Sequence, residues 1–408
     1  MRHGRVAAAV LVAVACGSGE KVETAAAGVP GADAGATTAD AGMVGVDAGG
    51  VAADAGTVKT ACDGLVPTVS GTPLVVDVGS GSVTPTPICS AARPDEGTGT
   101  VPLRFASYDS SVGGSYENAW VFYRSSDAAV LGRLQWSPGE GPVALLTHPD
   151  GFTGIELSPE SGEIDLHSLT HEGAESLETP TRAERSVVAD PAGGGMVTFE
   201  VQRSAAQYAL RYDRFDSDAG LAATAVVATG PPLGADQDVT WLAGTTTSGD
   251  TLVVFAKTDG GCRAVWLDRK GGRTSAEFAP ARCTLQQLHP LLDGTLAVSS
   301  NDLDGNPAVV ALARPRTAGF EDPPRWLAGI ALREFFLLPG GKGYALRRQG
   351  PGQPIEILAT TGETCGKVRP AELDKGPFVI GRDGTLVEQD LTGSAGPCTF
   401  RWYPQLFK

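Results

Sequence analysis

The stretch Asp293-Gly-Thr-Leu-Ala-Val298 reads as a tight turn followed by a short strand, and variants of it recur along the chain. Two of them are Gly249-Asp-Thr-Leu-Val-Val-Phe255 and Asp383-Gly-Thr-Leu-Val-Glu388. Asp-Gly and glycine-rich pairs supply the positive φ that hairpin turns need, and alternating side chains are typical of half-buried strands. The repeated stretch therefore predicts antiparallel strands that are joined by short turns.

Seven strands of this kind follow one another from about Phe105, and each has a partner strand after a polar loop. The first strands begin near Asn118, Thr153, Met196, Thr251, Thr295, Gly343 and Thr385. The partner strands begin near Val130, Gly162, Ala206, Cys262, Pro307, Gln353 and Pro397. Residues 105–408 thus divide into seven units of about 43 residues, a period typical of four-stranded β-propeller blades.

This pattern resembles β-propeller domains over about three quarters of the chain, and the resemblance implies an all-β fold. We predict a β-propeller of about seven four-stranded blades. Six or eight blades are alternatives, because the unit from Asp236 to Phe278 is longer than the others. A pair of β-sandwiches is less favoured, because the units are about equal in length. No signature of a particular propeller subfamily is complete.

The composition limits the kinds of partner. The chain has 408 residues, among them 54 Gly and 28 Pro, and its formal net charge is −15. Hydrophobic residues make up 42%, which is enough for a packed core. The acidic balance argues against a protein that neutralises nucleic-acid phosphates, and no apolar run has the length of a transmembrane helix. We therefore expect a globular domain without a nucleic-acid partner.

The N-terminus has the features of an export signal. Two arginines in the first five residues precede ten small apolar residues at positions 6–15, and Cys16 follows. The junction Ala13-Val-Ala-Cys16 resembles the lipobox of bacterial lipoproteins. The resemblance implies that residues 1–15 are a signal peptide and that Cys16 is acylated. Gly17 rather than Asp after the cysteine favours the outer membrane, and an ordinary secretory signal is the alternative.

Residues 16–60 follow as a predicted tether, in which Asp-Ala-Gly recurs every seven residues at Asp33, Asp40, Asp47 and Asp54. A coiled coil is disfavoured because no large apolar residues form a seam and every repeat carries a glycine. This composition cannot offset the entropy cost of ordering, so we predict a disordered linker that spans about 35 Å. A calcium site is disfavoured because each aspartate stands alone.

Few side-chain constellations point to catalysis. The sequence has neither a Gly-x-Ser-x-Gly elbow nor a phosphate-binding glycine loop. The spacing of His167 and His171 would suit zinc on a helix, but this region is expected to be strand and loop, so both are expected to be ordinary surface histidines. His148 and His289 lie elsewhere. The stretch Asn301–Asn306 matches half of a calcium loop, yet a plain turn explains it better. We expect no catalytic residue, metal site or cofactor.

Four further features have structural interpretations. Trp266 and Trp402 lie on matching strands and are expected in blade cores rather than at a ligand. The pairs Arg347-Arg348 and Arg314-Pro-Arg316 are expected at solvated strand edges.

Six cysteines remain after Cys16, an even number that predicts three disulfides in an exported chain. Cys262 and Cys283 flank Gly271-Gly272, so a hairpin at these glycines places the two cysteines opposite each other.

The other pairs depend on how the ring closes. Too few residues follow the last strand to supply an outer strand, so residues 61–104 are expected to provide it at Pro73–Val78. This closure favours the pairs Cys89–Cys398 and Cys62–Cys365. The alternative is Cys62–Cys89 together with Cys365–Cys398.

Two classes of function fit these features. The first is a monomeric, non-catalytic binding or scaffold propeller, which a lipid anchors in the outer membrane and which captures an envelope protein or glycan. The second is an exported propeller hydrolase that acts on a sugar or lactone at the central channel, with carboxylates as acid and base. The repeats place no recurring Asp, Glu or His on inward-facing positions, and this favours binding over catalysis.

Overall fold

The computed structural model describes most of the chain from Ala61 onward, in segments separated by short gaps. The described ranges are 61–67, 74–78, 87–91, 99–109, 115–137, 140–148, 150–157, 164–181, 187–190, 195–217, 220–234, 237–256, 260–280, 283, 285–301, 307–330, 335–338, 341–347, 354–368, 378–380, 384–389 and 398–404. The expected signal peptide, Cys16 and the Asp-Ala-Gly linker lie outside them. Within these ranges, no helix has the length and hydrophobicity that a membrane span requires.

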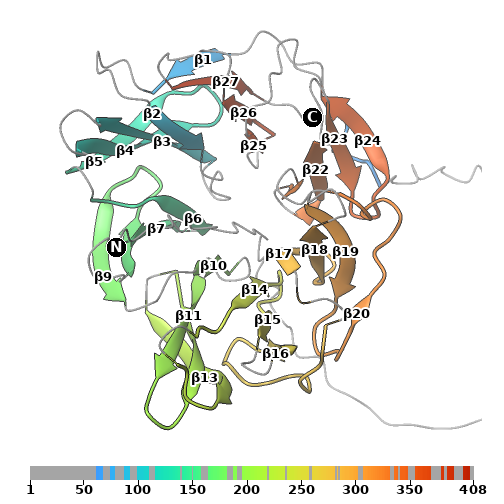
Figure 1. Cartoon of the computed structure of the whole chain (residues 1–408). Helices are drawn as coiled ribbons and strands as arrows, with labels where there is room; N and C mark the ends of the chain where they lie inside the picture. Colours follow the sequence, from blue (N-terminus) through green and yellow to red (C-terminus); the bar gives the residue numbers. More distant parts are fainter. Residues whose placement is uncertain are drawn as a thin grey trace, which may run out of the picture. The chain divides into compact units, whose positions relative to one another are not determined.

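The described strands form seven antiparallel sheets, which we call blades 1 to 7 and which follow one another around a ring (Figure 1). Blade 1 contains β2 (Pro87–Ala91), β3 (Thr100–Asp109), β4 (Ser115–Arg124) and β5 (Val130–Trp136). Blade 2 contains β6 (Ala144–His148), β7 (Gly151–Leu157), β8 (Ile164–Leu169) and β9 (Glu175–Thr181). Blade 3 contains β10 (Val187–Ala189), β11 (Met196–Arg203), β12 (Tyr208–Phe215) and β13 (Leu221–Gly230).

Blade 4 contains β14 (Trp241–Thr245), β15 (Thr251–Ala256) and β16 (Cys262–Leu267). Blade 5 contains β17 (Leu285–Pro290), β18 (Leu296–Asn301), β19 (Pro307–Ala313) and β20 (Phe320–Glu321). Blade 6 contains β21 (Phe335–Leu337), β22 (Gly343–Arg347), β23 (Ile355–Ala359) and β24 (Thr364–Val368). Blade 7 contains β25 (Phe378–Ile380), β26 (Leu386–Gln389), β27 (Thr399–Tyr403) and β1 (Leu74–Asp77). The prediction of an all-β propeller with seven blades is confirmed.

Short turns at 246–250 and 291–295 join the first and second strands of blades 4 and 5, as the repeated stretch predicts. Gly294 has φ of 80° and Gly384 has φ of 79°, which is the left-handed conformation that glycine adopts without strain. Asp293 stabilises its turn further, because its Oδ1 accepts hydrogen bonds from the N–H and the hydroxyl of Thr295. The local sequence therefore explains why a strand begins at this position in blade 5.

Central strands of blades 4 and 6 are buried more completely than the alternating pattern predicts. In β15 every residue from Thr251 to Phe255 is buried, and in β23 all five residues are buried. A propeller blade has a neighbouring blade on each of its two faces, so its central strands have no face left for solvent. The prediction that these strands are half-buried is therefore wrong.

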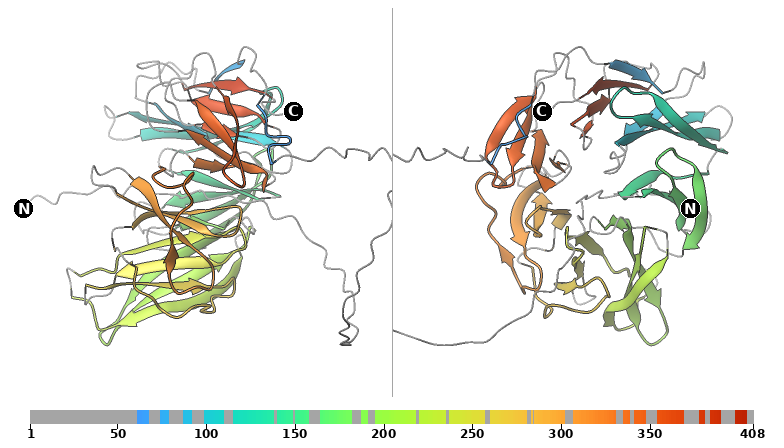
Figure 2. Two further views of the ribbon diagram at one scale, coloured as in Figure 1. Left: turned by 90° about the vertical axis from the view of Figure 1, so that its right-hand side faces the viewer. Right: turned by 180° about the vertical axis from the view of Figure 1, so that it is seen from behind.

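The ring closes through a strand from the N-terminal side of the domain. β1 pairs antiparallel with β27, with Leu74 opposite Trp402, and completes blade 7 (Figure 2). This is the stretch that the sequence assigns to ring closure.

Blades 1 and 4 depart from the expected repeat. The strand near Asn118 was expected to correspond to β7 and β11, but β4 is the third strand of its sheet, because β3 supplies the second. In the described part of blade 4 there are three strands, and the outer position there holds the isolated bridges Ala264↔Phe278 and Leu267↔Arg273. The prediction of four strands per blade is therefore wrong for blade 4.

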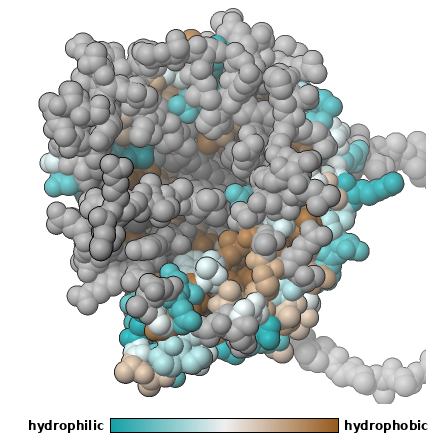
Figure 3. Space-filling model, in the orientation of Figure 1, coloured by the Kyte–Doolittle hydropathy of each residue, from teal (hydrophilic) through white to brown (hydrophobic). Residues whose placement is uncertain are grey.

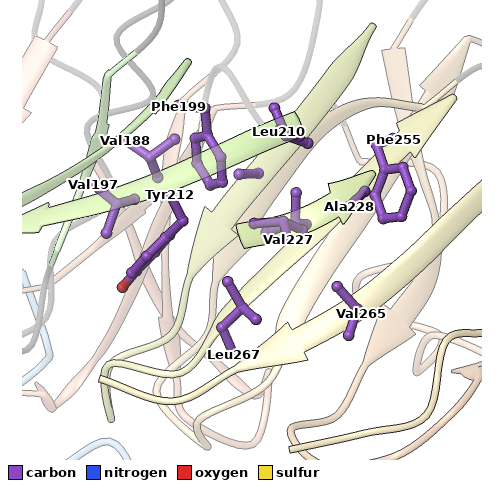
Figure 4. Packing of buried hydrophobic residues seen from close by; sticks show 12 residues of the cluster. Val188, Val197, Phe199, Leu210, Tyr212, Val227, Ala228, Phe255, Val265 and Leu267 are labelled. Carbon is purple, nitrogen blue, oxygen red and sulfur yellow. The ribbon is translucent and has the colours of Figure 1, made fainter. Parts of the chain in front are cut away.

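The hydrophobic core is divided into clusters, several of which lie between adjacent blades. One cluster joins blades 3 and 4, where Phe199 and Leu210 pack with Phe255 and Leu267 (Figure 4). In the view of Figure 3, apolar residues gather toward the middle of the ring, over the sheets that contain β14 and β17. Burying one large aliphatic or aromatic side chain contributes about 1.5–3 kcal/mol, so these clusters hold neighbouring blades together.

Candidate functional site

A buried ion pair within blade 3 is hydrogen-bonded to blade 4. The guanidinium of Arg214 on β12 contacts the carboxylate of Asp190, which follows β10, and both side chains are almost fully buried. Nη1 of Arg214 also donates to the carbonyl oxygen of Gly249 in the β14–β15 turn, at 3.0 Å. Burial and, to a smaller degree, the nearby Arg269 lower the pKa of Arg214 to about 10. The guanidinium therefore stays charged at neutral pH and acts as a fixed link between the blades.

Neutral hydrogen bonds make similar links elsewhere in the ring. At the closure between blades 7 and 1, the indole N–H of Trp402 donates to the carbonyl oxygen of Ser125 at 2.6 Å. The hydroxyl of Thr385 donates to the same oxygen at 3.2 Å. In blade 1, the indole N–H of Trp120 donates to the carbonyl oxygen of Pro142, which leads into blade 2, at 2.9 Å. Trp402 therefore belongs to the core, as expected for it and for Trp266, which is also fully buried.

Blade 2 contains a histidine between two carboxylates. His167 on β8 is 3% exposed, and its Nε2 lies 2.9 Å from Oε2 of Glu156 on β7. Its Nδ1 contacts Oε1 of Glu175 on β9. The two ring nitrogens thus contact carboxylates from both neighbouring strands, so this residue clamps three adjacent strands. We call these three residues the His167 clamp.

Sequence reasoning missed the His167 clamp for a definite reason. The expectation of an ordinary surface histidine at position 167 is wrong, because the ring of Trp136 in blade 1 packs edge-on against His167 and the two glutamates flank it. Glu175 reaches the ring only because the register of β8 and β9 shifts between Ser168 and Leu169. No pattern in the sequence signals such a bulge.

The clamp shows no sign of being a metal centre. Among the described residues, no group of three or more His, Cys, Asp or Glu side chains has an arrangement that could hold a metal ion. His171 lies at the turn after β8, where its ring contacts Phe152 edge-on. His289 makes a similar contact with Phe335 in another part of the ring. The histidines therefore do not converge on one site, and the side chain of His148 is not among those described.

The remaining sequence candidates divide between described and undescribed positions. Arg314 forms an exposed ion pair with Glu321 on the short outer strand β20, at 3.1 Å, which agrees with a solvated strand edge. Arg316 is partly exposed nearby. The loop at 302–306, which holds most of the calcium-like stretch, and residue 348 lie outside the described residues.

Two of the expected disulfides are present. Cys62 is bonded to Cys365 across a sequence separation of 303 residues, and Cys262 is bonded to Cys283 across 21 residues. The first bond rules out the alternative pair Cys365–Cys398. Cys398 is disulfide-bonded as well. The side chain of Cys89 is not described, so Cys89–Cys398 stays a prediction.

The outer strands of the blades form the rim of the ring, and most of them carry a feature that blocks pairing with another chain. Exposed strand edges are templates for added strands, and short length, charged residues and proline are the usual protection. β5 contains Arg133, β9 contains Glu175, Glu178 and Pro180, and β24 contains Lys367. β20 has two residues, and β1 has four and ends in an aspartate.

The outer strand of blade 3 lacks every one of these features. β13 is ten residues long, and its sequence LAATAVVATG contains neither a charged residue nor proline. Leu221 is 56% exposed and Val226 is 53% exposed. We call residues Leu221–Val226 the blade 3 edge, and it is the candidate binding site of the described surface. A ten-residue run without charge could have been noticed in the sequence, although its place on the rim could not.

No family model matches the chain, and no curated protein matches it. Among solved structures, the chain is similar to the Dos1 propeller, with a TM-score of 0.42 and 10% identity over 84% of this chain and 96% of that one. It is also similar to quinohemoprotein alcohol dehydrogenase from Comamonas testosteroni, with a TM-score of 0.38 and 8% identity over 85% and 78% of the two chains. For TolB from Acinetobacter baumannii the TM-score is 0.31 and the identity 13%, over 79% and 81%. Likenesses at this level say nothing about activity.

Proposed function

We propose that this chain is a non-catalytic binding or scaffold propeller, which a lipid on Cys16 anchors in the bacterial outer membrane. The observation that carries the proposal is the use of buried charged groups inside the ring. Arg214 pairs with Asp190 inside blade 3 and donates a hydrogen bond to Gly249 of blade 4, and His167 lies between two carboxylates. These side chains could otherwise take part in acid–base chemistry, but here they hold strands and blades together. A rigid ring of this kind can present a fixed surface to a binding partner.

The disulfides support an extracytoplasmic location. Structural disulfides persist in oxidising compartments and are rare in the cytosol, and this chain contains Cys62–Cys365 and Cys262–Cys283. The lipobox-like junction before Cys16 supports the anchor. In this proposal the chain acts as a monomer on the end of its linker, and its partner is an envelope protein or a glycan.

Metabolic labelling with a fatty acid tests the anchor. The full chain is expected to take up the label and to fractionate with membranes, whereas Cys16→Ser abolishes both. Ser18→Ala, two residues away, serves as the matched control and keeps the label. Equal labelling of Cys16→Ser and the unchanged chain would refute the lipid anchor.

Substrate turnover tests the non-catalytic part of the proposal. The purified chain is expected to leave chromogenic glycosides and lactones intact over a range of pH. Reproducible turnover that disappears in a Glu156→Gln or Glu175→Gln variant would show that the His167 clamp is a catalytic site and would overturn the proposal.

A further inference from the structure

We propose that the blade 3 edge binds an extended, uncharged peptide segment of a second protein, which adds to the sheet as a fifth strand. The inference deepens the proposed binding role by naming the class of partner, and it does not depend on the lipid anchor. In strand addition, main-chain hydrogen bonds supply the affinity and alternate side chains supply the selectivity.

The backbone of the blade 3 edge is available for pairing. Among the residues that the structure describes, Leu221–Val226 find backbone partners only on β12, whose strand lies on the inner side. Alternate residues of an antiparallel strand direct their N–H and C=O groups away from the partner strand. The edge therefore offers a row of main-chain donors and acceptors to an added strand.

The edge ends at a defined position. Register shifts leave Val227 at one end and Ala222 near the other end without a pairing partner on β12. The guanidinium of Arg273 in blade 4 donates to the carbonyl oxygen of Val227, and the Val227 side chain is fully buried. The regular part of the edge is therefore Ala223–Val226, along which an added strand runs for about 13 Å at the usual rise per residue.

The side chains along the edge define the chemistry of the ligand. Ala222, Thr224 and Val226 are exposed, whereas Ala223 and Ala225 are half-buried against the core of blades 3 and 4. Gly271 of blade 4 approaches Ala225 so closely that an added Cβ would lie 2.7 Å from the Ala225 Cβ. The inner face of the edge is thus covered. On its exposed face, small or β-branched uncharged residues of the ligand would lie beside the small and β-branched residues of the edge.

Charge and area favour a peptide segment over a second copy of the chain. A strip about 13 Å long and 10 Å wide buries roughly 130 Å² on each partner, far below the ~1,200 Å² total of a specific interface between globular proteins. Two copies would each carry a net charge of −15 and would repel one another. A flexible uncharged segment needs no more surface than the edge itself.

A labelled peptide tests the inference directly. The probe is the fluorescein-labelled peptide Ser-Thr-Val-Thr-Val-Thr-Val-Ser, and the protein is the full chain with Cys16→Ser, handled without lipid. Fluorescence anisotropy is expected to show saturable binding. A second probe of the same sequence with N-methyl groups on all its threonines and valines cannot donate main-chain hydrogen bonds along either edge of that stretch, and its binding is expected to be at least tenfold weaker.

Matched variants locate the binding. Val226→Lys introduces a charge on the edge, and it should weaken binding about tenfold, whereas Val130→Lys on β5 should change it less than twofold. Val226 and Val130 have similar exposure, at 53% and 61%, so both substitutions are expected to leave the fold intact. Unchanged melting temperatures would confirm this for both variants. Thr224→Lys, a second change on the edge, should act like Val226→Lys.

Several results would overturn the inference. They are absence of binding, equal binding of the N-methylated probe, or equal loss in Val130→Lys. Self-association by sedimentation velocity that Val226→Lys abolishes would identify a second copy as the occupant instead. If the peptide fails to bind the Cys16→Ser chain, but the unchanged chain takes up the fatty acid in the labelling experiment, the edge inference fails and the anchored role stands. If the peptide binds but the unchanged chain takes up no fatty acid, the edge inference stands and the lipid anchor fails.

Discussion

Blades 2 and 3 are neighbours with the same strand order, but they place charge in opposite ways. Blade 2 keeps its buried charge within one sheet, in the His167 clamp, and has glutamates on its outer strand. Blade 3 uses Arg214 to reach the next blade, and its outer strand has no charge at all. The cohesion of the ring and the chemistry of its rim therefore rest on different residues, and each can be changed without the other.

The largest effect is expected from breaking the link between blades 3 and 4. Arg214→Met leaves the carboxylate of Asp190 buried without its cation and should lower the free energy of unfolding by about 3–5 kcal/mol. Arg203→Met, on β11 of the same sheet, removes an exposed pair with Asp238 between β13 and β14 and should cost less than about 1 kcal/mol. Urea unfolding measures both, and similar losses would show that Arg214 is not a specific lock.

Blade 3 should also make the domain sensitive to alkaline pH. Burial raises the pKa of Tyr212 to about 12 from its ordinary value of 10.0, an effect that the nearby Thr251 hydroxyl partly offsets. Below pH 10 the phenol is protonated in both the folded and the unfolded state, so stability is unaffected. Between about pH 10 and 12 only the unfolded state loses the proton, and stability should fall by roughly 2–3 kcal/mol.

Tyr212→Phe provides the matched test of this pH dependence. The variant should lose part of the decline above pH 10 in urea unfolding, and the rest belongs to other groups such as Tyr344, whose pKa burial also raises to about 12. A decline identical to that of the unchanged chain would mean that Tyr212 ionises as easily in the folded state.

A smaller loss is expected in blade 2. His167→Phe removes the hydrogen bonds to Glu156 and Glu175 and should cost about 1–3 kcal/mol. The loss should be below that of Arg214→Met because the Glu156 and Glu175 side chains are 15% and 33% exposed and can gain water. The exposed Glu172→Ala is the control, with an expected change below about 0.5 kcal/mol. A loss larger than that of Arg214→Met would reverse the comparison of the two blades.

The smallest effect on stability is expected at the blade 3 edge. Val226→Lys places a charge on an exposed strand position and should change the free energy of unfolding by less than about 0.5 kcal/mol. Thermal unfolding of this variant beside Val130→Lys measures the difference. A decrease of several kcal/mol in the free energy of unfolding would mean that Val226 contributes to the core. The rim and the interior of the ring could then not be changed independently.

Much of the architecture could be predicted because it is local. The turn at Asp293-Gly294 recurs in similar form around the ring, and each copy needs only neighbouring residues to start a strand. The pair Cys262–Cys283 follows from the spacing around one such turn. Ring closure and Cys62–Cys365 follow from counting strands at the two ends of the domain.

The polar sites could not be predicted, because they depend on contacts between strands and between blades. The His167 clamp requires a register shift in blade 2, and the link from Arg214 to Gly249 requires two blades to meet. The sequence also does not show that the described part of blade 4 lacks a fourth strand, because the unit for this blade is longer than the others.

The sequence by itself determined an all-β repeat of seven units, its closing strand and two of its disulfides, since turn chemistry, strand pattern and cysteine spacing are encoded over short stretches. Only the tertiary structure decided which charged groups are buried and which strand faces outward without protection. The uncharged run Leu221–Gly230 shows the difference. The same ten residues would be an ordinary buried strand at the inner end of a blade, and they become a candidate binding edge because the fold places them on the rim.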